Sequence, residues 1–395
     1  GAISRSLCGS ARHFSGRRSG RAHALWRAGF RCDGPCGFCS SETYNLSLLR
    51  LNQAELAYGT QHILKDASLQ LERGDKVALI GRNGTGKTTT LAHRVAHLCL
   101  NNVSPEQILL LTFTRLAAKE MVQRSQQMVA SAIKANAGSP RVGAPTKIDW
   151  VGTFHAIGAR FIRHYHENLG LEESFSVLDR ADSAGLMDLE RQALGFHKSK
   201  DRFPQKKTCL DIYSRTVNAQ CQLETTLQES FPHFADWHDE LKSLFAAYVE
   251  RKLAQQTLDY DDLLLYWFYL VEDERIAEDI GSHFSHILVD EYQDTNRLQA
   301  EVIRRIRPDG AGLTVVGDDA QSIYSFRAAD VENILDFPEQ FPGAQVIKLE
   351  DNYRSTQEIL NASNVLMSEA DRTYQKDLRS ARGGGARPVL VTVED

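Results

Sequence analysis

The chain has 395 residues, more than the roughly 250–300 residues at which a single hydrophobic core stops growing, so we expect two or three domains. Its hydrophobic content of 42% and charged content of 25% are those of an ordinary globular protein. No apolar run approaches the roughly 20 residues of a membrane-spanning helix, which excludes a membrane span. The formal net charge of −5 argues against a polybasic nucleic-acid coat but leaves room for a local basic groove.

Residues 1–45 differ from the rest of the chain in composition. They are rich in arginine, and no acidic residue precedes Asp33. This composition predicts disorder. It is also typical of an organellar transit peptide, whereas the missing initiator methionine favours a fragment or an out-of-frame extension. The sequence leaves these alternatives open.

The cysteines do not form an evenly spaced framework. Three of them, Cys32, Cys36 and Cys39, have CxxxCxxC spacing, which could ligate a metal or resembles the cluster loop of radical enzymes. Because no barrel pattern follows, we favour a cluster without function. In the body of the chain we expect isolated buried thiols at Cys99, Cys209 and Cys221. This usage favours a reducing cytosol, so the predicted location is cytoplasmic.

From about residue 47 the pattern becomes that of an alternating α/β protein. The segment KVALIG (76–81) is typical of a short buried strand, and the residues after Lys87 have the pattern of a helix. Three further apolar strands end in polar residues and precede helical stretches: ILLLTFT (108–114), HILVDE (286–291) and LTVVGD (313–318). This order predicts a parallel sheet with functional groups at the carboxyl ends of its strands.

Two segments depart from this alternation. Residues 165–255 are helical, charged and free of such strands, which predicts an inserted helical subdomain. After about residue 340, QVIKLEDNYRSTQEILNASNVLM begins a new strand and helix. We expect a further domain to start there.

The decapeptide GRNGTGKTTT (81–90) lies where the first strand becomes a helix. Its pattern Gly81-x4-Gly86-Lys87-Thr88 matches the phosphate-binding loop in full, in the context that such a loop requires. Glycines let backbone N–H groups point at phosphates, a lysine brings a charge to the β and γ oxygens, and a threonine hydroxyl is a magnesium ligand. We therefore predict a nucleotide with Mg²⁺, bound by Gly81, Asn83, Gly84, Thr85, Gly86, Lys87, Thr88 and Thr89.

A pair of carboxylates follows another predicted strand. In HILVDEYQDTN (286–296) the apolar run delivers Asp290 and Glu291 to the carboxyl edge of the sheet. One of them is expected to hold Mg²⁺ through water, and the other to activate the attacking water.

Six segments, in this order, resemble those of the UvrD/Rep/PcrA helicases of superfamily 1: TFTRLAAKEM (112–121), VGTFHAIGARFIR (151–163), LDYDDLL (258–264), VDEYQDTN (289–296), VGDDAQSIYSFRAAD (316–330) and LEDNYRST (349–356). The resemblance implies an α/β P-loop NTPase with a RecA-like parallel sheet, an inserted helical subdomain and the start of a second RecA-like lobe. It implies a 3′-to-5′ DNA translocase with a role in DNA repair. Its motor lobe would bind ATP against the second lobe, and single-stranded DNA would cross both.

Carried over to this sequence, the resemblance implies roles for individual residues. Lys87 and Thr88 would hold phosphate and Mg²⁺, and Asp290 and Glu291 would be the magnesium and water-activating pair. Gln321 would sense the γ-phosphate, and Arg354 would be one of two arginine fingers. Tyr353 would lie against the adenine, and Arg115 would lie near the nucleotide.

The resemblance also implies a DNA track lined by Phe113, His155, Tyr324 and Phe326. Aromatic faces offer sequence-tolerant stacking of about 1–3 kcal/mol per base, as a translocating motor needs. Many relatives have tryptophan where Phe326 stands, and the smaller ring should weaken stacking. Because Gln321 and the last two of these rings lie within six residues, we expect this loop to couple ATP to DNA.

The predicted organisation follows from these segments. A disordered Arg-rich extension spans residues 1–45, and a RecA-like ATP-binding motor lobe comprises residues 46–164 plus 256–338. An inserted helical subdomain spans 165–255, and the start of a second RecA-like lobe spans 339–395. The implied partners are single-stranded DNA and DNA junctions, with no membrane.

The match fails upstream of the phosphate loop. Relatives carry an LNxxQ element whose glutamine reads adenine, but here LNQAE has Glu55 in that place and lies too far upstream. The segment from residue 48 to the loop instead resembles the start of an ABC-F ATPase, with Tyr58 where such proteins stack an aromatic ring on adenine. A natural fusion, a recombination scar and an assembly error all explain such a junction.

Motifs V and VI of the helicase family, which supply the second arginine finger, are not found in the sequence. Because loss of one finger costs on the order of 10³-fold or more in rate, we expect ATP and DNA binding with weak hydrolysis and no processive unwinding. The alternatives are an ABC-F-like ribosome-associated ATPase, for which no LSGGQ-like signature is found, and a nucleotide-binding fragment without turnover.

Overall fold

A computed structural model describes residues 49–58, 61–71, 76–101, 103–135, 148–198, 202–325, 328–370, 372–389 and 391, with the backbone alone at 49–71 and 131–135. The chain divides into two units, Gly1–Gln70 and Leu71–Asp395. In the first unit, the predicted extension at 1–45 lies outside the described residues. Strand β1 (Leu49–Tyr58) pairs with strand β2 (Gln61–Leu71), which runs one residue into the second unit. The likeness of this region to an ABC-F ATPase stays a prediction.

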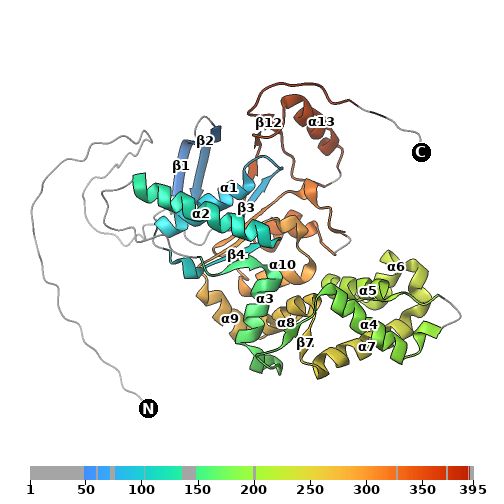
Figure 1. The fold of residues 1–395 in the computed structure, drawn as a ribbon. Coiled ribbons are helices and arrows are strands. Elements are labelled where there is room, and N and C mark those ends of the chain that lie inside the picture. Colours follow the sequence, from blue (N-terminus) through green and yellow to red (C-terminus); the bar gives the residue numbers. More distant parts are fainter. Residues whose placement is uncertain are drawn as a thin grey trace, which may run out of the picture. The chain divides into compact units, whose positions relative to one another are not determined.

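Within the described part of the second unit, a six-stranded parallel sheet has the order β10-β3-β9-β8-β4-β5. Figure 1 labels two of its strands, β3 and β4. Its strands are β3 (Val77–Gly81), β4 (Ile108–Thr112), β5 (Val151–Thr153), β8 (His286–Val289), β9 (Leu313–Gly317) and β10 (Gln345–Leu349). The prediction of a parallel α/β sheet is therefore confirmed. The predicted strands at 76–81, 108–114, 286–291 and 313–318 match β3, β4, β8 and β9 to within two residues at each end.

The central strands are apolar on both faces because helices cover both. Alternate residues such as Ile80, Leu111 and Val289 join one large core. Helices α3 (Phe154–His164), α8 (Tyr260–Glu272), α9 (Glu274–His283), α10 (Arg297–Ile306), α11 (Glu332–Leu335) and α12 (Phe337–Gln340) contribute to that core. Helices α1 (Lys87–Leu100) and α2 (Arg115–Ala135) pack against each other and contact β3, β9, β4 and β5.

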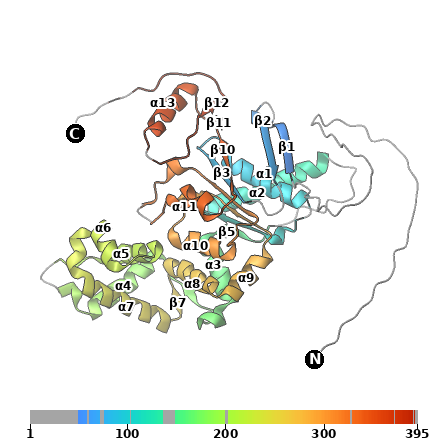
Figure 2. The same cartoon turned by 180° about the vertical axis from the view of Figure 1, so that it is seen from behind.

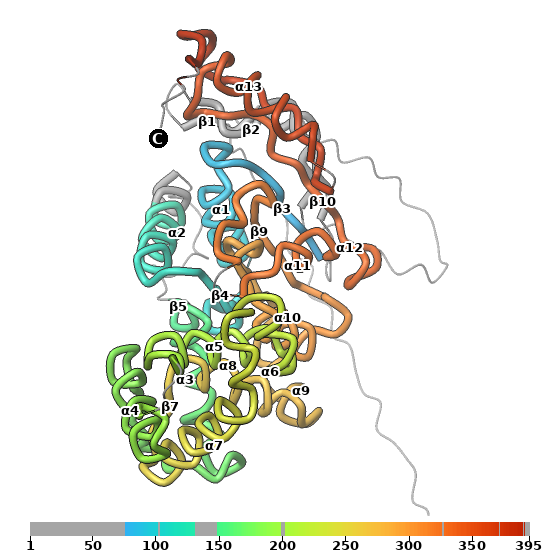
Figure 3. The backbone as a smooth tube through the Cα atoms, turned by 90° about the vertical axis from the view of Figure 1, so that its right-hand side faces the viewer, coloured from blue at the N-terminus to red at the C-terminus, as the bar shows by residue number. Residues whose placement is uncertain are grey.

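Helices follow α3 within the range 165–255, for which we predicted an inserted subdomain; the bounds of that subdomain stay a prediction. Figure 3 shows its four helices gathered in one bundle: α4 (Arg180–Ala193), α5 (Lys206–Ala219), α6 (Leu223–Ser230) and α7 (His238–Ala254). They bury a core of their own, which includes Met187, Leu210 and Leu244. Two short parallel strands, β6 (Ser176–Val177) and β7 (Thr257–Leu258), pair where the chain enters and leaves this bundle.

The segment LDYDDLL forms the joint between the insert and the sheet-covering helices. Asp259 and Asp262 make a capping box that begins α8. The buried ammonium of Lys252 lies 2.7 Å from Asp259 Oδ2 and 2.6 Å from Asp262 Oδ2. Because a buried charge needs close partners, this triad fixes the end of α7 against the start of α8.

Strand β10 pairs in parallel with β3 at one edge of the sheet (Figure 2). Residues 339–395 were predicted to start a second lobe, but β10 completes the sheet of the first, so the sheet crosses the predicted boundary. Beyond it come β11 (Asp351–Asn352), α13 (Gln357–Ser368) and β12 (Arg379–Ser380), of which β11 and β12 pair. The assignment of these later residues to a second lobe stays a prediction.

Two further expectations from the sequence concern thiols and membranes. Cys209 is buried, whereas Cys99 and Cys221 are half-buried, and all three are free. The expectation of buried thiols is thus correct for Cys209 alone. None of the helices in the described ranges has the length and apolarity that crossing a bilayer demands.

Helix α3 approaches α8 closely at Gly158. A Cβ atom there would lie 2.8 Å from the Leu263 carbonyl oxygen and 3.2 Å from Trp267 Cε3. We expect Gly158→Ala to lower the free energy of unfolding by about 1–3 kcal/mol, because backbone cannot yield as a flexible side chain does. Denaturant unfolding measures the change.

The matched control is Gly185→Ala in helix α4, where a Cβ would have no atom within 4 Å. Alanine should raise stability there by up to about 1 kcal/mol through its helix propensity. Equal effects of the two substitutions would contradict close packing at Gly158.

Candidate active site

The phosphate loop joins β3 to α1. Gly84 and Gly86 have φ angles of 91° and 83°, which favour glycine. Thr85 closes the turn by donating its backbone N–H and its hydroxyl to the Arg82 carbonyl, at 3.0 and 2.6 Å. Lys87 begins α1, and its side chain is 5% exposed. The backbone thus adopts the curled form that was predicted from the glycine spacing.

The two predicted carboxylates lie at the end of β8, within reach of this loop. Lys87 Nζ is 3.4 Å from Glu291 Oε2, so the structure brings together the loop lysine and a carboxylate more than 200 positions later. Asp290 donates its backbone N–H to the Leu111 carbonyl at 2.9 Å. Glu291 has a φ of 50°, a left-handed conformation that is uncommon outside glycine.

Burial has a large effect on Asp290, which is 5% exposed. Burial first, and then the charge of Glu291, raise the pKa of the Asp290 carboxyl to about 7, while the charge of Lys87 opposes the rise. The carboxylate form therefore lacks enough positive charge around it. A bound cation would supply that charge.

Of the two predicted magnesium ligands, Asp290 has this requirement, and Thr88 follows Lys87 in the first turn of α1. Among the residues that the structure describes, no group of three or more His, Cys, Asp or Glu side chains is arranged to hold a metal by itself. Mg²⁺ characteristically uses one or two carboxylates and completes its shell with water and substrate phosphates. A single carboxylate beside a phosphate loop suits that mode of binding.

Gln293 connects two loops of the site, a role that the sequence analysis did not assign. Its side-chain Nε2 donates to Glu291 Oε2 at 3.0 Å, and its Oε1 accepts from the backbone N–H of Asp318 at 2.9 Å. It therefore joins the loop after β8 to the loop after β9. Its position in the VDEYQDTN segment indicates that Gln293 lies near the site. A glutamine at that position does not by itself reveal that its side chain connects the two loops.

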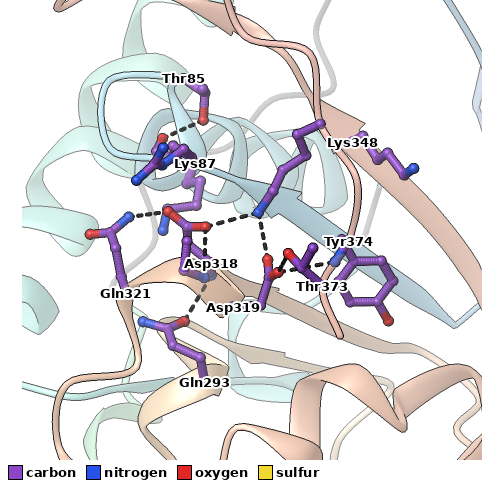
Figure 4. Close-up of polar contacts among 12 residues, drawn as sticks. Thr85, Lys87, Gln293, Asp318, Asp319, Gln321, Lys348, Thr373 and Tyr374 are labelled. Atoms are coloured by element: carbon purple, nitrogen blue, oxygen red, sulfur yellow. Dashed lines mark hydrogen bonds and ion pairs between the residues drawn. The ribbon is translucent and has the colours of Figure 1, made fainter. Parts of the chain in front are cut away.

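The predicted γ-phosphate sensor, Gln321, lies in the loop after β9. Its Nε2 donates to Asp318 Oδ2, and Asp318 is fully buried (Figure 4). Its orientation is therefore set by a carboxylate that the sequence analysis also left without a role.

The segment that follows β10 lies directly against the phosphate loop. Asn352 Nδ2 donates to the Asn83 carbonyl at 2.9 Å, and the Tyr353 N–H donates to the Gly84 carbonyl at 2.9 Å. A Cβ at Gly84 would come within 2.5 Å of the Arg354 Cβ. The predicted nucleotide residues Tyr353 and Arg354 are thus adjacent to the loop, and Asn352 is a further contact that sequence reasoning missed.

Of the predicted DNA-track residues, two are brought into contact. The rings of Phe113 and Tyr324 are 5.0 Å apart between centroids, although they come from loops after different strands. His155, at the start of α3, packs instead edge-on against Tyr260, at 5.8 Å. Phe326 lies outside the described residues. Arg115, predicted to be near the nucleotide, is exposed at the first position of α2.

Comparison with known proteins identifies relatives of the chain. The UvrD/REP helicase N-terminal domain family matches residues 65–342. The ATP-dependent DNA helicase PcrA of Bacillus subtilis is 34% identical over 313 residues, which cover 78% of this chain and 40% of that protein. The PcrA proteins of Staphylococcus epidermidis and Staphylococcus aureus are 33% identical over 307 residues and 32% identical over 309 residues.

The two staphylococcal matches cover 76% and 77% of this chain and 39% of each relative. The chain therefore spans about two fifths of the length of these proteins. The family match includes the phosphate loop, the carboxylate strand and the Gln321 loop. Because this family match spans more than half of the chain, the chain belongs to the UvrD/REP helicase N-terminal domain family.

Proposed function

We propose that the chain is the ATP-binding motor portion of a UvrD/Rep-type DNA helicase, which couples ATP hydrolysis to 3′-to-5′ movement on single-stranded DNA. The contact between Lys87 and Glu291 carries the proposal. It joins a phosphate-binding group to a water-activating group, and both are needed for phosphoryl transfer. The names of the PcrA relatives, ATP-dependent DNA helicases, support the same activity.

The proposed nucleotide site uses the loop between β3 and α1. Backbone N–H groups at the start of α1, together with Lys87, would hold the β and γ phosphates. Thr88 and Asp290 would hold Mg²⁺, which neutralises charge on the phosphate oxygens. Tyr353 would lie against the adenine, and Arg354 would stabilise charge that develops during transfer.

Hydrolysis requires a base near the terminal phosphate. Glu291 is 32% exposed on its side chain, more open than its neighbour Asp290, and so can reach water. The hydrogen bond from Gln293 orients its carboxylate, and the ion pair with Lys87 shows that this carboxylate lies beside the phosphate loop. Glu291 would therefore accept the proton of the attacking water.

The proposed DNA track starts from the Phe113 and Tyr324 rings. Tyr324 lies three residues beyond Gln321, so a change at the γ-phosphate sensor would be transmitted to the aromatic contact through a short loop. His155 and Phe326 are proposed to extend this track. Stacking faces suit a motor because they hold any base.

The proposed partners are single-stranded DNA and DNA junctions, in a DNA-repair role. We also propose a cytoplasmic location, which the free cysteines in the body of the chain, Cys99, Cys209 and Cys221, favour. The match to the UvrD/REP family does not favour the ABC-F-like alternative.

Nucleotide affinity tests the role of Lys87. Replacing Lys87 with alanine should weaken binding of Mg²⁺-ATP about 10- to 100-fold, because a charged hydrogen bond of roughly 1.5–3 kcal/mol is lost. Titration of a fluorescent ATP analogue measures the change. Lys242→Ala, on an exposed position of helix α7, is the matched control and should bind as the parent does. Equal affinity of both variants would argue against a nucleotide at this loop.

A measurement of ATP hydrolysis distinguishes a catalytic role of Glu291 from a role in nucleotide binding alone. Glu291→Gln preserves the shape of the side chain and an acceptor oxygen but removes the base. We expect ATP affinity within about threefold of the parent, and a turnover rate in the presence of oligo(dT) that is lower by about 10²- to 10⁴-fold. If the parent binds ATP but does not turn it over with or without oligo(dT), the chain is a nucleotide-binding fragment and the motor proposal fails.

Binding of DNA tests the aromatic pair. Phe113→Ala and Tyr324→Ala should each weaken oligo(dT) binding about 5- to 150-fold, which corresponds to the roughly 1–3 kcal/mol of one stacked base. Fluorescence anisotropy at fixed salt measures the affinity. The control is Tyr269→Ala, which removes an aromatic ring that is 47% exposed near the carboxyl end of α8. This variant should have little effect on oligo(dT) binding. A loss of the same size in all three variants would count against a localised track.

A further inference from the structure

Two neighbouring carboxylates beside the site share one lysine from a distant part of the chain. The side chains of Asp318 and Asp319 are 0% and 3% exposed. Lys376 Nζ lies 2.9 Å from Asp318 Oδ1 and 2.5 Å from Asp319 Oδ1, and its own side chain is 4% exposed. These three groups form what we call the Lys376 cluster.

The cluster depends on its lysine. Two buried carboxylates with one cation leave an excess of negative charge, and each carboxylate has lost the water that would stabilise it. Burial alone would raise the pKa of Asp319, but hydrogen bonds from Lys376 and Thr373 lower it. Without Lys376 the pair would have to protonate, separate or admit water.

Asp318 transmits the position of Lys376 to the predicted γ-phosphate sensor. Its Oδ1 accepts from Lys376 and its Oδ2 accepts from the Gln321 side-chain amide. Figure 4 shows Asp318 hydrogen-bonded to both Gln321 and Gln293. Because the two oxygens belong to one rigid carboxylate, the direction in which Lys376 holds Asp318 also sets the direction of Gln321.

The same cluster is continuous with the catalytic groups. The Asp318 N–H donates to Gln293, Gln293 donates to Glu291, and Glu291 pairs with Lys87. A hydrogen-bonded chain therefore runs from residues beyond β11 to the phosphate loop.

The segment that carries Lys376 is held by other contacts as well. Arg372 pairs with Glu332 and Asp336 at α11. The Tyr374 hydroxyl donates to the Ile334 carbonyl at 3.0 Å, and the Tyr374 N–H donates to Asp319 Oδ2 at 3.0 Å. The Arg372 contacts do not involve either carboxylate of the cluster. Loss of Lys376 can thus be compared with loss of an ion pair from the same segment.

We propose that Lys376 is a positioning residue for γ-phosphate recognition, because it orients Asp318 and, through Asp318, the Gln321 amide. This inference rests on the proposed function, since it requires a nucleotide at the phosphate loop. It adds a residue beyond α13 to the apparatus that distinguishes ATP from ADP. Lys376 acts through Asp318 and need not touch the nucleotide.

The test is the ratio of affinities for ADP and for a non-hydrolysable ATP analogue, measured by fluorescence titration with Mg²⁺ on the full chain. In the parent, we expect tighter binding of the analogue. Lys376→Met should reduce that preference at least fivefold while the ADP affinity changes less than twofold. Lys376→Arg, which restores the charge, should recover at least half of the preference on a logarithmic scale.

Arg372→Gln is the matched control. It removes an ion pair of the same segment but leaves the cluster intact, so the preference should stay within twofold of the parent. If Lys376→Met and Arg372→Gln change the preference equally, or if Lys376→Met weakens ADP and analogue to the same extent, the role of Lys376 is structural and the proposal is wrong.

A second variant covers the case in which Lys376→Met does not fold. The double variant Asp319→Asn, Lys376→Met keeps the net charge of the cluster, and circular dichroism checks its folding. It should fold and still lose the preference for the analogue, whereas a retained preference overturns the proposal. A parent chain that binds neither nucleotide would overturn the proposed function itself. A parent that discriminates, with Lys376 variants that do so equally well, would overturn only this inference.

Discussion

The ion pair between Lys87 and Glu291 is the constraint on which the rest of the site depends. The two residues follow β3 and β8, which are not neighbours, because β9 lies between them in the sheet. For these charges to meet, the carboxyl ends of three adjacent parallel strands must be level. The register of the sheet, fixed by apolar residues buried on both faces, provides that alignment. The loop after β9, with Asp318, consequently lies between the phosphate loop and the carboxylates.

The helical insert is tied to the same loops. Asn296, which caps α10 just after the carboxylates, donates from its side chain to Asn218 of the insert at 2.8 Å. Arg215, also in α5, donates to the Ser325 carbonyl, one residue after Tyr324, at 2.8 Å. A bundle with its own core thus contacts the segment after the carboxylates and the segment after the Gln321 loop. Movement of the insert would therefore act on two parts of the site together.

The sequence predicts much of this arrangement, because its strongest signals are local. The buried strands are continuous apolar runs, and the phosphate loop has a fixed spacing of glycine and lysine, so β3, β8 and β9 and the positions of Lys87 and Glu291 follow directly. Gln293, Asp318 and Lys376 were not predicted because their roles depend on partners from other loops. Lys376 lies 58 positions from Asp318, and nothing in its own neighbourhood indicates a buried ammonium. Strand β10 was assigned to a new lobe because its sequence marks a strand but not the neighbour with which it pairs.

The balance of charge around the carboxylates supports the proposal that a nucleotide binds here together with a cation. Five carboxylates gather around the ends of β8 and β9, those of Asp290, Glu291, Asp294, Asp318 and Asp319, and two lysines, Lys87 and Lys376, pair with some of them. Burial and the charge of Glu291 raise the pKa of Asp294 to about 6, as they do more strongly for Asp290. A triphosphate without a cation would add further negative charge to this surplus. Lys87 alone could not neutralise both the Glu291 carboxylate and the phosphates. In the proposed function, Mg²⁺ bound with the triphosphate would place positive charge beside Asp290. Contacts with the phosphates would then draw Lys87 away from Glu291. In the proposed function, the pairing of Lys87 with Glu291 therefore belongs to the nucleotide-free state, and its exchange for phosphate contacts would release Glu291 to act as the base.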